Sequence, residues 1–200
     1  GYLNLGGMFF YLGNLEAARD EFETLLEVRT LTPRYRYAAL SNLGTIYYYQ
    51  GRFAEASEAF ERALEVDSTS HFVWGNLGSA YNLLENRDEE ADRAYARATA
   101  LALRTLELNP RNAEVLLSLA SYRLHQGRPL RARELMNRAL REAGDNVGVL
   151  FQAGQLGELL GDRDRAVALI SEALERGYSR WIIEADPELA ELRASSSLSL

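Results

Sequence analysis

The sequence contains no cysteine and no lysine. Without cysteine there are no disulfides, no thiolate metal sites and no cysteine nucleophiles. All 22 basic residues are arginine, which excludes Schiff-base enzymes and the lysine-dependent phosphate sites of kinases and P-loop proteins. What remains is a chain with 47% hydrophobic and 26% charged residues. This composition is typical of a globular protein with a packed core.

Long apolar runs are also missing. No stretch approaches the roughly 20 apolar residues of a membrane-spanning helix, and the first residues lack the pattern of a signal peptide, so we expect no membrane insertion. The net charge of -7 disfavours a nucleic-acid partner, whose phosphates bind basic surfaces. The expected location is the cytoplasm, with the periplasm as the alternative. Because the chain begins with Gly1 partway through a repeated pattern, we expect it to be a segment of a longer protein.

An internal repeat runs along the chain. The tripeptide Asn-Leu-Gly at 42–44 recurs at 76–78, and the Leu-Ala pair at 119–120 has a counterpart at the same interval, Ala-Gly at 153–154. Five units align in this way, and each has an alanine followed four positions later by a large apolar residue. The alanines are Ala18, Ala56, Ala91, Ala132 and Ala166, and the large residues are Phe22, Phe60, Tyr95, Met136 and Ile170.

The spacing within a unit predicts a pair of helices. Leu40, Leu43 and Tyr47 fall on one helical face, which predicts that this face is buried. A small residue on the first helix is expected to meet the bulky residue of the second, so that the two helices approach closely; these small residues are Gly44, Gly78, Ala120 and Gly154. A residue suited to the left-handed conformation is expected to end the first helix, and the candidates are Gly13, Gly51, Asn86, Gly127 and Gly161.

On these residues the chain resembles the tetratricopeptide repeat. The likeness is strongest in residues 42–67, NLGTIYYYQGRFAEASEAFERALEVD, and covers about residues 3–176. It implies an all-α fold, a right-handed superhelix (α-solenoid) of about five helix-turn-helix pairs, and a scaffold that binds a protein or peptide ligand. The closing segment is similar to the C-terminal tetratricopeptide regions of bacterial signalling proteins, namely serine/threonine kinases, adenylyl cyclases and regulators. That likeness implies an alternative, a regulatory or sensory module that works through intramolecular contacts or self-association.

The expected organisation is a single solenoid domain over residues 1–194. Its units are about 1–32, 37–70, 71–108, 113–146 and 147–178, followed by a cap at 179–194 and a flexible tail at 195–200. The third unit departs most from the pattern, because residues 88–108 contain no helix breaker and predict one long helix. In the cap, Asp186 is expected to begin a short helix with Pro187 in its first turn. Apolar residues of the cap are expected to cover the last helix pair: Trp181, Ile182, Ile183, Leu189 and Leu192.

The resemblance also indicates where a partner binds, because the family places five positions of each first helix on the inner, concave wall of the superhelix. The expected partner-binding residues are Phe10, Tyr11, Asn42, Thr45, Tyr48, Tyr49, Phe72, Asn76, Ser79, Asn82, Leu83, Leu117, Ser121 and His125. Two alternatives stay open: Tyr48 and Tyr49 pack between neighbouring repeats, and Asn42 and Asn76 serve packing. The family's clamp for a terminal carboxylate, made of lysines, asparagines and an arginine, is absent, since the matching positions hold Ser41, Thr45, Gly75 and Ser79.

No catalytic, metal or cofactor site is expected. The two histidines, His71 and His125, lie in different units and have no neighbours at a metal-ligand spacing. The acidic residues of the second unit fall on outward faces among arginines, which is typical of a solvated, ion-paired surface: Glu55, Glu58, Glu61 and Glu65. The arginine-rich segment 128–141 leaves docking of an anion or a nucleic acid as a minor alternative. We therefore expect a binding protein that is not an enzyme.

Overall fold

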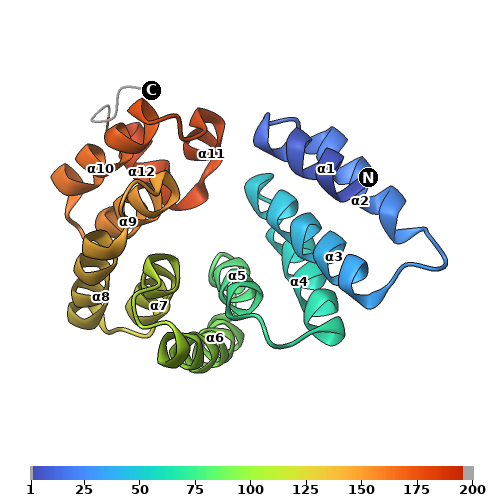
Figure 1. Cartoon of the computed structure of the whole chain (residues 1–200), viewed down its shortest axis with the longest axis horizontal. Coiled ribbons are helices and arrows are strands. Elements are labelled where there is room, and N and C mark those ends of the chain that lie inside the picture. Colours follow the sequence, from blue (N-terminus) through green and yellow to red (C-terminus); the bar gives the residue numbers. More distant parts are fainter. Residues whose placement is uncertain (1, 196–200) are drawn as a thin grey trace. The chain divides into compact units, whose positions relative to one another are not determined.

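The computed structural model describes residues 2–195 and is all-helical (Figure 1). This part of the chain contains 12 α-helices and one 3-10 helix. The chain divides into two compact units, Gly1–Ala98 and Thr99–Leu200. A single domain over residues 1–194 stays a prediction. The expected flexible tail at 195–200 lies, apart from Ser195, outside the described residues.

The first unit is built from successive helical hairpins. Helix α1 (Tyr2–Tyr11) packs on α2 (Leu15–Leu26), α3 (Pro33–Tyr49) packs on α4 (Phe53–Val66), and α5 (His71–Asn82) precedes α6 (Asp88–Leu108). The first helices of the pairs also contact one another in order, α1 with α3 and α3 with α5. This stacking of equivalent helices confirms the tetratricopeptide-like solenoid.

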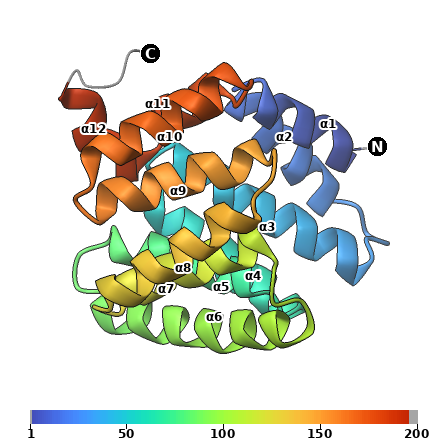
Figure 2. The same ribbon diagram turned by 60° about the vertical axis from the view of Figure 1, so that its left-hand side comes forward.

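The second unit repeats the arrangement and ends in shorter helices. Helix α6 has 21 residues and passes from the first unit into the second, which confirms the predicted long helix (Figure 2). Helix α7 (Ala113–His125) packs on α8 (Pro129–Glu142), and α9 (Val147–Leu159) packs on α10 (Arg163–Glu175). The chain then forms α11 (Arg180–Ala185), the 3-10 helix η1 (Pro187–Leu189) and α12 (Ala190–Ala194). None of the helices within residues 2–195 combines the length and the apolar content that crossing a bilayer requires.

The five predicted turn residues all adopt the left-handed conformation. The φ angle is 60° at Asn86, 79° at Gly13 and 72° at Gly51, and Gly127 and Gly161 have 69° and 74°. In the second pair, the backbone N–H of Gly51 donates to the carbonyl of Tyr48 at 3.0 Å and the next N–H donates to Tyr47 at 2.9 Å. These bonds satisfy carbonyls that the helix end would otherwise leave unpaired, so the turn closes a tight hairpin.

The contact of small and large residues is also confirmed. A Cβ built on Gly44 would lie 2.6 Å from the ring of Phe60, and one built on Gly154 would lie 2.5 Å from Ile170. Both distances are far below van der Waals contact, so only glycine allows the second helix this close. In these hairpins a ring or branched chain therefore fills the space of the missing Cβ, whereas the α7–α8 hairpin has Ala120 and Met136 at the matching positions.

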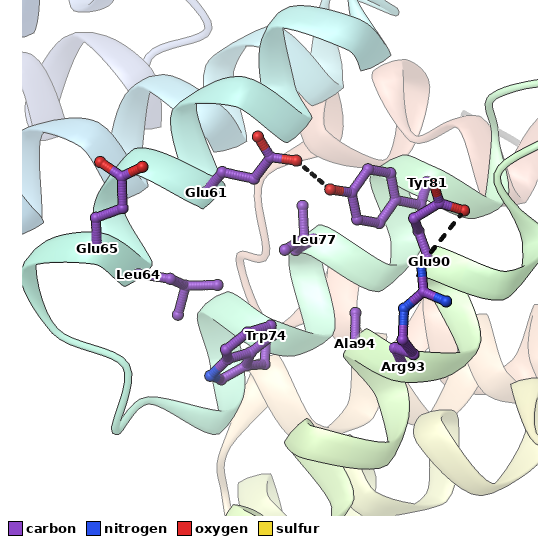
Figure 3. A pocket seen from close by; sticks show the side chains of 9 residues that line it. All are labelled: Glu61, Leu64, Glu65, Trp74, Leu77, Tyr81, Glu90, Arg93 and Ala94. Carbon is purple, nitrogen blue, oxygen red and sulfur yellow. Dashed lines mark hydrogen bonds and ion pairs between the residues drawn. The ribbon is translucent and has the colours of Figure 1, made fainter.

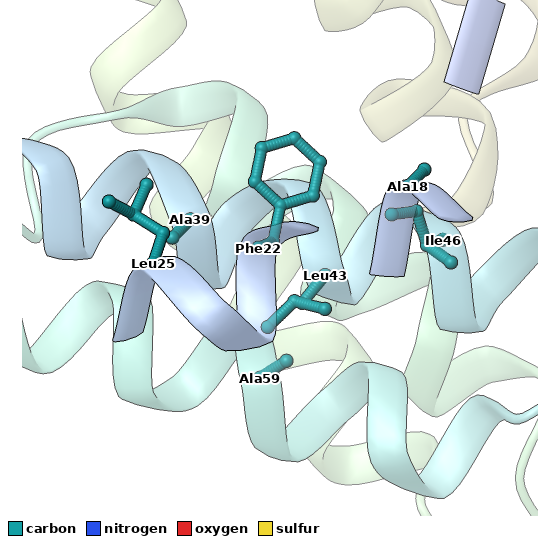
Figure 4. Packing of buried hydrophobic residues seen from close by; sticks show 7 residues of the cluster. All are labelled: Ala18, Phe22, Leu25, Ala39, Leu43, Ile46 and Ala59. Atoms are coloured by element: carbon teal, nitrogen blue, oxygen red, sulfur yellow. The ribbon is translucent and has the colours of Figure 1, made fainter. Parts of the chain in front are cut away.

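Neighbouring hairpins of the first unit share one apolar core. Figure 4 shows that its side chains come from α2, α3 and α4 and point toward one another. Helix α3 therefore packs between α2 and α4, and the burial of its apolar side chains depends on both of these helices. The residues of this core are Ala18, Phe22, Leu25, Ala39, Leu43, Ile46 and Ala59.

Helix starts differ from the sequence prediction at one place. Helix α3 begins at Pro33, ahead of the predicted unit start at 37, because proline fits the first helical position, where no N–H partner is needed. Other helices begin at a side-chain cap, whose oxygen accepts a bond from a backbone N–H of the first turn. These capping residues are Asn14, Ser70, Asn112 and Asn146.

The C-terminal segment forms the predicted cap. Asp186 Oδ1 accepts a bond from the backbone N–H of Glu188 at 2.9 Å, which starts η1 with Pro187 in its first turn. Ile183, Leu189 and Leu192 are fully buried, Ile182 is buried and Trp181 is half-buried. The apolar residues of the cap thus lie inside the second unit.

Two carboxyl groups lie close together in this cap, Asp186 buried and Glu188 half-buried. Gln155 Nε2 on α9 donates to Asp186 Oδ2 at 2.7 Å and to Glu188 Oε2 at 3.3 Å. Burial raises the pKa of Asp186 to about 6, and burial together with the nearby charge of Asp186 raises the pKa of Glu188. The cap therefore favours the protonated forms of both groups.

Candidate protein-binding surface

One face of α5 presents large side chains to solvent. Phe72 is 44% exposed and Leu83, at the end of the helix, is 38% exposed, and Asn76 between them is exposed. On the other side of the same helix, a Cβ on Gly78 would lie 2.8 Å from the ring of Tyr95. Because a helix turns by about 100° per residue, the close contact at Gly78 points the stripe of Phe72, Asn76 and Leu83 away from α6.

Polar residues extend this face onto α3 and toward the end of α5. Asn42 is exposed and its Nδ2 donates to the carbonyl of Ala38 at 2.7 Å. Thr45 is half-buried and its hydroxyl donates to the carbonyl of Ser41 at 3.1 Å. Both donors therefore serve α3 itself. Asn82 is exposed at the last position of α5.

An aromatic cluster joins α1, α3 and the start of α4. The ring centroids of Phe10 and Tyr49 lie 5.8 Å apart, those of Tyr48 and Tyr49 also 5.8 Å, and those of Tyr48 and Phe53 5.6 Å. All four residues are half-buried, whereas Tyr11 is 60% exposed. Tyr48 and Tyr49 thus take part in packing within the first unit and keep a part of their surface exposed.

The exposed ring of Phe72 rests on a buried histidine. The ring centroids of His71 and Phe72 are 3.9 Å apart, and His71 is only 5% exposed. Burial lowers the pKa of His71 to about 4, so the imidazole is neutral near pH 7. Contact with the neutral, buried imidazole restricts the ring of Phe72 before a ligand binds. The ring therefore loses less conformational entropy when a ligand covers it.

Four further predicted positions are half-buried or buried. Ser79 is half-buried and its hydroxyl lies 3.2 Å from the hydroxyl of Tyr95 on α6. In the second unit, Leu117 is 2% exposed, while Ser121 and His125 are half-buried. Burial lowers the pKa of His125. The exposed predicted residues are therefore concentrated on α5, with Asn42 on α3 and Tyr11 on α1 in addition.

The first unit also holds a groove that the sequence did not predict. It lies between α4 and α6 with α5 as its floor (Figure 3) and has a volume of about 490 Å³. Glu61 was expected on an ion-paired surface, but it accepts a bond from the hydroxyl of Tyr81, and burial together with this bond raises the pKa of Tyr81 to about 12. Glu55, by contrast, does pair with Arg52 at 2.9 Å.

The arginine-rich helix of the second unit is held largely by internal bonds. Arg131 pairs with Glu134 at 2.7 Å and Arg133 pairs with Asp162 at 3.0 Å. Arg138 donates to the carbonyl of Pro110. Three of the five guanidinium groups expected to dock an anion are thus engaged within the protein. Elsewhere, no group of three or more His, Asp or Glu side chains in residues 2–195 is placed to hold a metal ion.

Sequence models of a known protein family match much of the chain. One model described as tetratricopeptide repeat matches residues 1–69, and a second with the same description matches residues 41–102 and 87–147. No curated protein matches the sequence.

Several solved structures are similar to this chain, and the first of those below shows the same fold. TTC0263, a thermophilic TPR protein of Thermus thermophilus, has a TM-score of 0.64 and 22% identity, over 98% of this chain and 96% of its own. MamA has a TM-score of 0.47 and 24% identity, over 86% and 94%. YrrB, described as a TPR protein with an unusual peptide-binding site, has a TM-score of 0.47 and 19% identity, over 92% and 89%.

Proposed function

We propose that this chain, which belongs to the tetratricopeptide repeat family, is a protein-interaction module. It holds a partner's peptide segment against α3 and α5. The observation that carries the proposal is the stripe of Phe72, Asn76 and Leu83, which stays exposed on α5 while most of that helix is packed. Helices of this family stack into extended surfaces of the kind that bind partners.

The chemistry of this stripe suits an extended or helical peptide. Phe72 and Leu83 offer apolar area that a ligand removes from water, which is the main source of affinity at such surfaces. Asn76 lies between them on α5 and Asn42 is exposed on α3, and an asparagine side chain both donates to and accepts from a peptide backbone. In our proposal the predicted residues on α1 and α3, including Tyr11, Tyr48 and Tyr49, extend the contact along these two helices.

A display selection with random peptides tests this function. The full chain is immobilised, enriched peptides are synthesised, and their dissociation constants are measured by fluorescence polarisation. We expect Phe72→Ala/Leu83→Ala to weaken binding by about tenfold or more, since loss of one buried anchor costs roughly 1–2 kcal/mol or more. The matched control is Leu130→Ala, which removes a residue that is 79% exposed on α8.

Circular dichroism keeps the result interpretable, because Phe72 and Leu83 are exposed and their truncation leaves the helices folded. If the selected peptides bind the double variant and the control equally well, the α5 stripe is not the binding surface. If no peptide is enriched above a blank support, the peptide-binding proposal itself is wrong.

The alternative, a regulatory module that associates with itself, is favoured by one observation. Leu103 is 41% and Leu108 is 90% exposed on the second half of α6, and apolar chains on a helix are a common means of self-association. Light scattering at increasing concentration separates the two proposals. Self-association predicts a rising mass for the native chain and a constant mass for Leu103→Glu/Leu108→Glu.

A further inference from the structure

The groove between α4 and α6 has an apolar floor and one strongly acidic wall. Leu77 and Tyr81 of α5 form its floor and Leu64 of α4 lines the groove with them. Leu64, Leu77 and Tyr81 are all buried, with exposed fractions of 8%, 3% and 6%. Figure 3 shows Glu61 and Glu65 side by side on α4, above Leu77 and Leu64. The two glutamates are four residues apart on a helix, so they share one face.

The opposite wall is already neutralised. On α6, Arg93 lies 3.5 Å from Glu89 and 3.9 Å from Glu90, and Arg87 lies 3.3 Å from Glu90. No ion pair within residues 2–195 involves Glu61 or Glu65. The negative charge that lacks a cation is therefore confined to the α4 wall.

Trp74 completes the groove with a fixed aromatic ring. Its indole N–H donates to the carbonyl of Ser68 at 3.0 Å, which holds the half-buried ring in place at the end of α5 nearest Glu65 (Figure 3). Trp74 lines the same groove as Glu61 and Glu65, and both an aromatic face and a carboxylate attract a cation. The apolar floor adds a surface for the methylene stem of a long basic side chain.

We propose that this groove binds an arginine or lysine side chain carried by a segment of a partner protein. The stem of the basic residue lies on Leu77 and Trp74, and its head binds between Glu61 and Glu65. A groove of about 490 Å³ falls within the usual range of ligand sites, and leaves room for apolar residues on either side of the basic one. This site is separate from the α5 stripe and does not depend on the function proposed above.

The test uses two matched peptides and the two tryptophans of the chain. The probes are acetyl-Leu-Arg-Leu-amide and its neutral counterpart acetyl-Leu-Gln-Leu-amide, titrated into the ¹⁵N-labelled full chain. The indole N–H signal of Trp74 reports the groove, and that of Trp181, in the second unit, is the internal control. We expect a saturable shift of Trp74 with the arginine peptide only, which weakens as salt is raised.

Variants of the two glutamates test whether their carboxylates bind the basic side chain. Glu65→Gln and Glu61→Gln keep the shape of the side chains, and glutamine at position 61 still accepts the bond from Tyr81. Each is expected to weaken the arginine peptide by about fivefold, the scale of one partly exposed charge pair. Glu58→Gln, exposed on the same helix, is the matched control and is expected to leave the affinity unchanged.

Several outcomes would overturn the proposal. Equal shifts with the arginine and glutamine peptides would make the groove an unspecific apolar patch, and equal shifts of Trp74 and Trp181 would mean that binding is not at this groove. Free L-arginine that binds as tightly as the peptide would indicate a small-molecule site. A shift of Trp74 that grows with protein concentration alone would indicate a second copy of the chain as the occupant.

Discussion

Replacing Gly44 by alanine should destabilise the protein, although alanine is the better helix former. The added Cβ would lie 2.6 Å from two atoms of the Phe60 ring and 2.9 Å from a third. Phe60 is 1% exposed, so its ring has no solvent side toward which it can move. Either the ring leaves its rotamer or α3 and α4 separate.

The magnitude follows from two opposing terms. Overpacking a buried site costs about 1–3 kcal/mol, and replacing glycine by alanine within a helix returns about 1 kcal/mol. With three ring atoms within 3.0 Å of the new carbon, the cost belongs in the upper part of that range. We expect a net loss of about 1–2 kcal/mol in the free energy of unfolding.

Urea unfolding followed by circular dichroism measures this difference. The matched control is Gly7→Ala in α1, where a Cβ meets nothing within 4 Å, so the stability is expected to stay equal or rise. Phe60→Leu should relieve the clash, and Gly44→Ala/Phe60→Leu should therefore lose less stability than the two single changes added together. A Gly44→Ala variant as stable as Gly7→Ala would refute the idea that close helix contact requires glycine here.

Three further results are expected. Gly51→Ala should cost about 1 kcal/mol in thermal unfolding, because φ is 72° there and a side chain disfavours this conformation; Gly51→Asn should cost less. The pKa values of Asp186 and Glu188 are raised in the folded protein, to about 6 and about 8, so their contribution to stability is present below the ordinary carboxyl range and is lost as the pH rises through these values. Hydrogen exchange in α11 and α12, corrected for intrinsic rates, should be faster at pH 8 than at pH 5, and Asp186→Asn/Glu188→Gln should reduce the difference. The pKa of His71 is lowered from 6.5 to about 4, so its contribution to the free energy of unfolding is present above pH 6.5 and is lost as the pH falls toward 4. Urea unfolding should show this loss of stability in the native chain, and His71→Gln should not show it.

Local rules explain why the fold could be predicted from the sequence. The spacing of Gly44 and Phe60, and the glycine at 51 between them, depends on contacts within one hairpin, and each hairpin repeats it. The long helix α6 was predicted for a similar reason, since only the absence of a breaker between residues 88 and 108 was needed. Periodicity reports such short-range geometry directly.

The groove could not be predicted in the same way. Its wall comes from Glu61 and Glu65 on α4, its floor from α5 and its far side from Arg93 on α6. Taken singly, each of these residues has the ordinary pattern of a solvated helix surface. Only the stacking of consecutive hairpins brings them around Trp74. Only the three-dimensional positions of the ion pairs on α6 show that Glu61 and Glu65 have no cationic partner within the described residues.

Some positions of the predicted wall lie in the interior for a related reason. Ser79 was assigned by its place in the repeat, but its hydroxyl meets that of Tyr95, because Gly78 beside it brings the Tyr95 ring against α5. Position in a repeat gives the direction of a side chain to within a fraction of a turn. The identity of the neighbouring large residue then decides whether that side chain reaches solvent.

Helix α5 shows how one short helix supplies two separate surfaces. At about 100° per residue, Phe72, Asn76 and Leu83 lie within a narrow stripe, and Trp74 and Tyr81 lie on nearly the opposite side of the helix axis. The residues between the two stripes, such as Val73 and Leu77 at 2% and 3% exposure, hold the helix in the stack. Because a solenoid gives each helix neighbours on only some of its sides, two faces stay accessible. A peptide on the α5 stripe and a basic side chain in the groove can therefore bind the first unit at the same time.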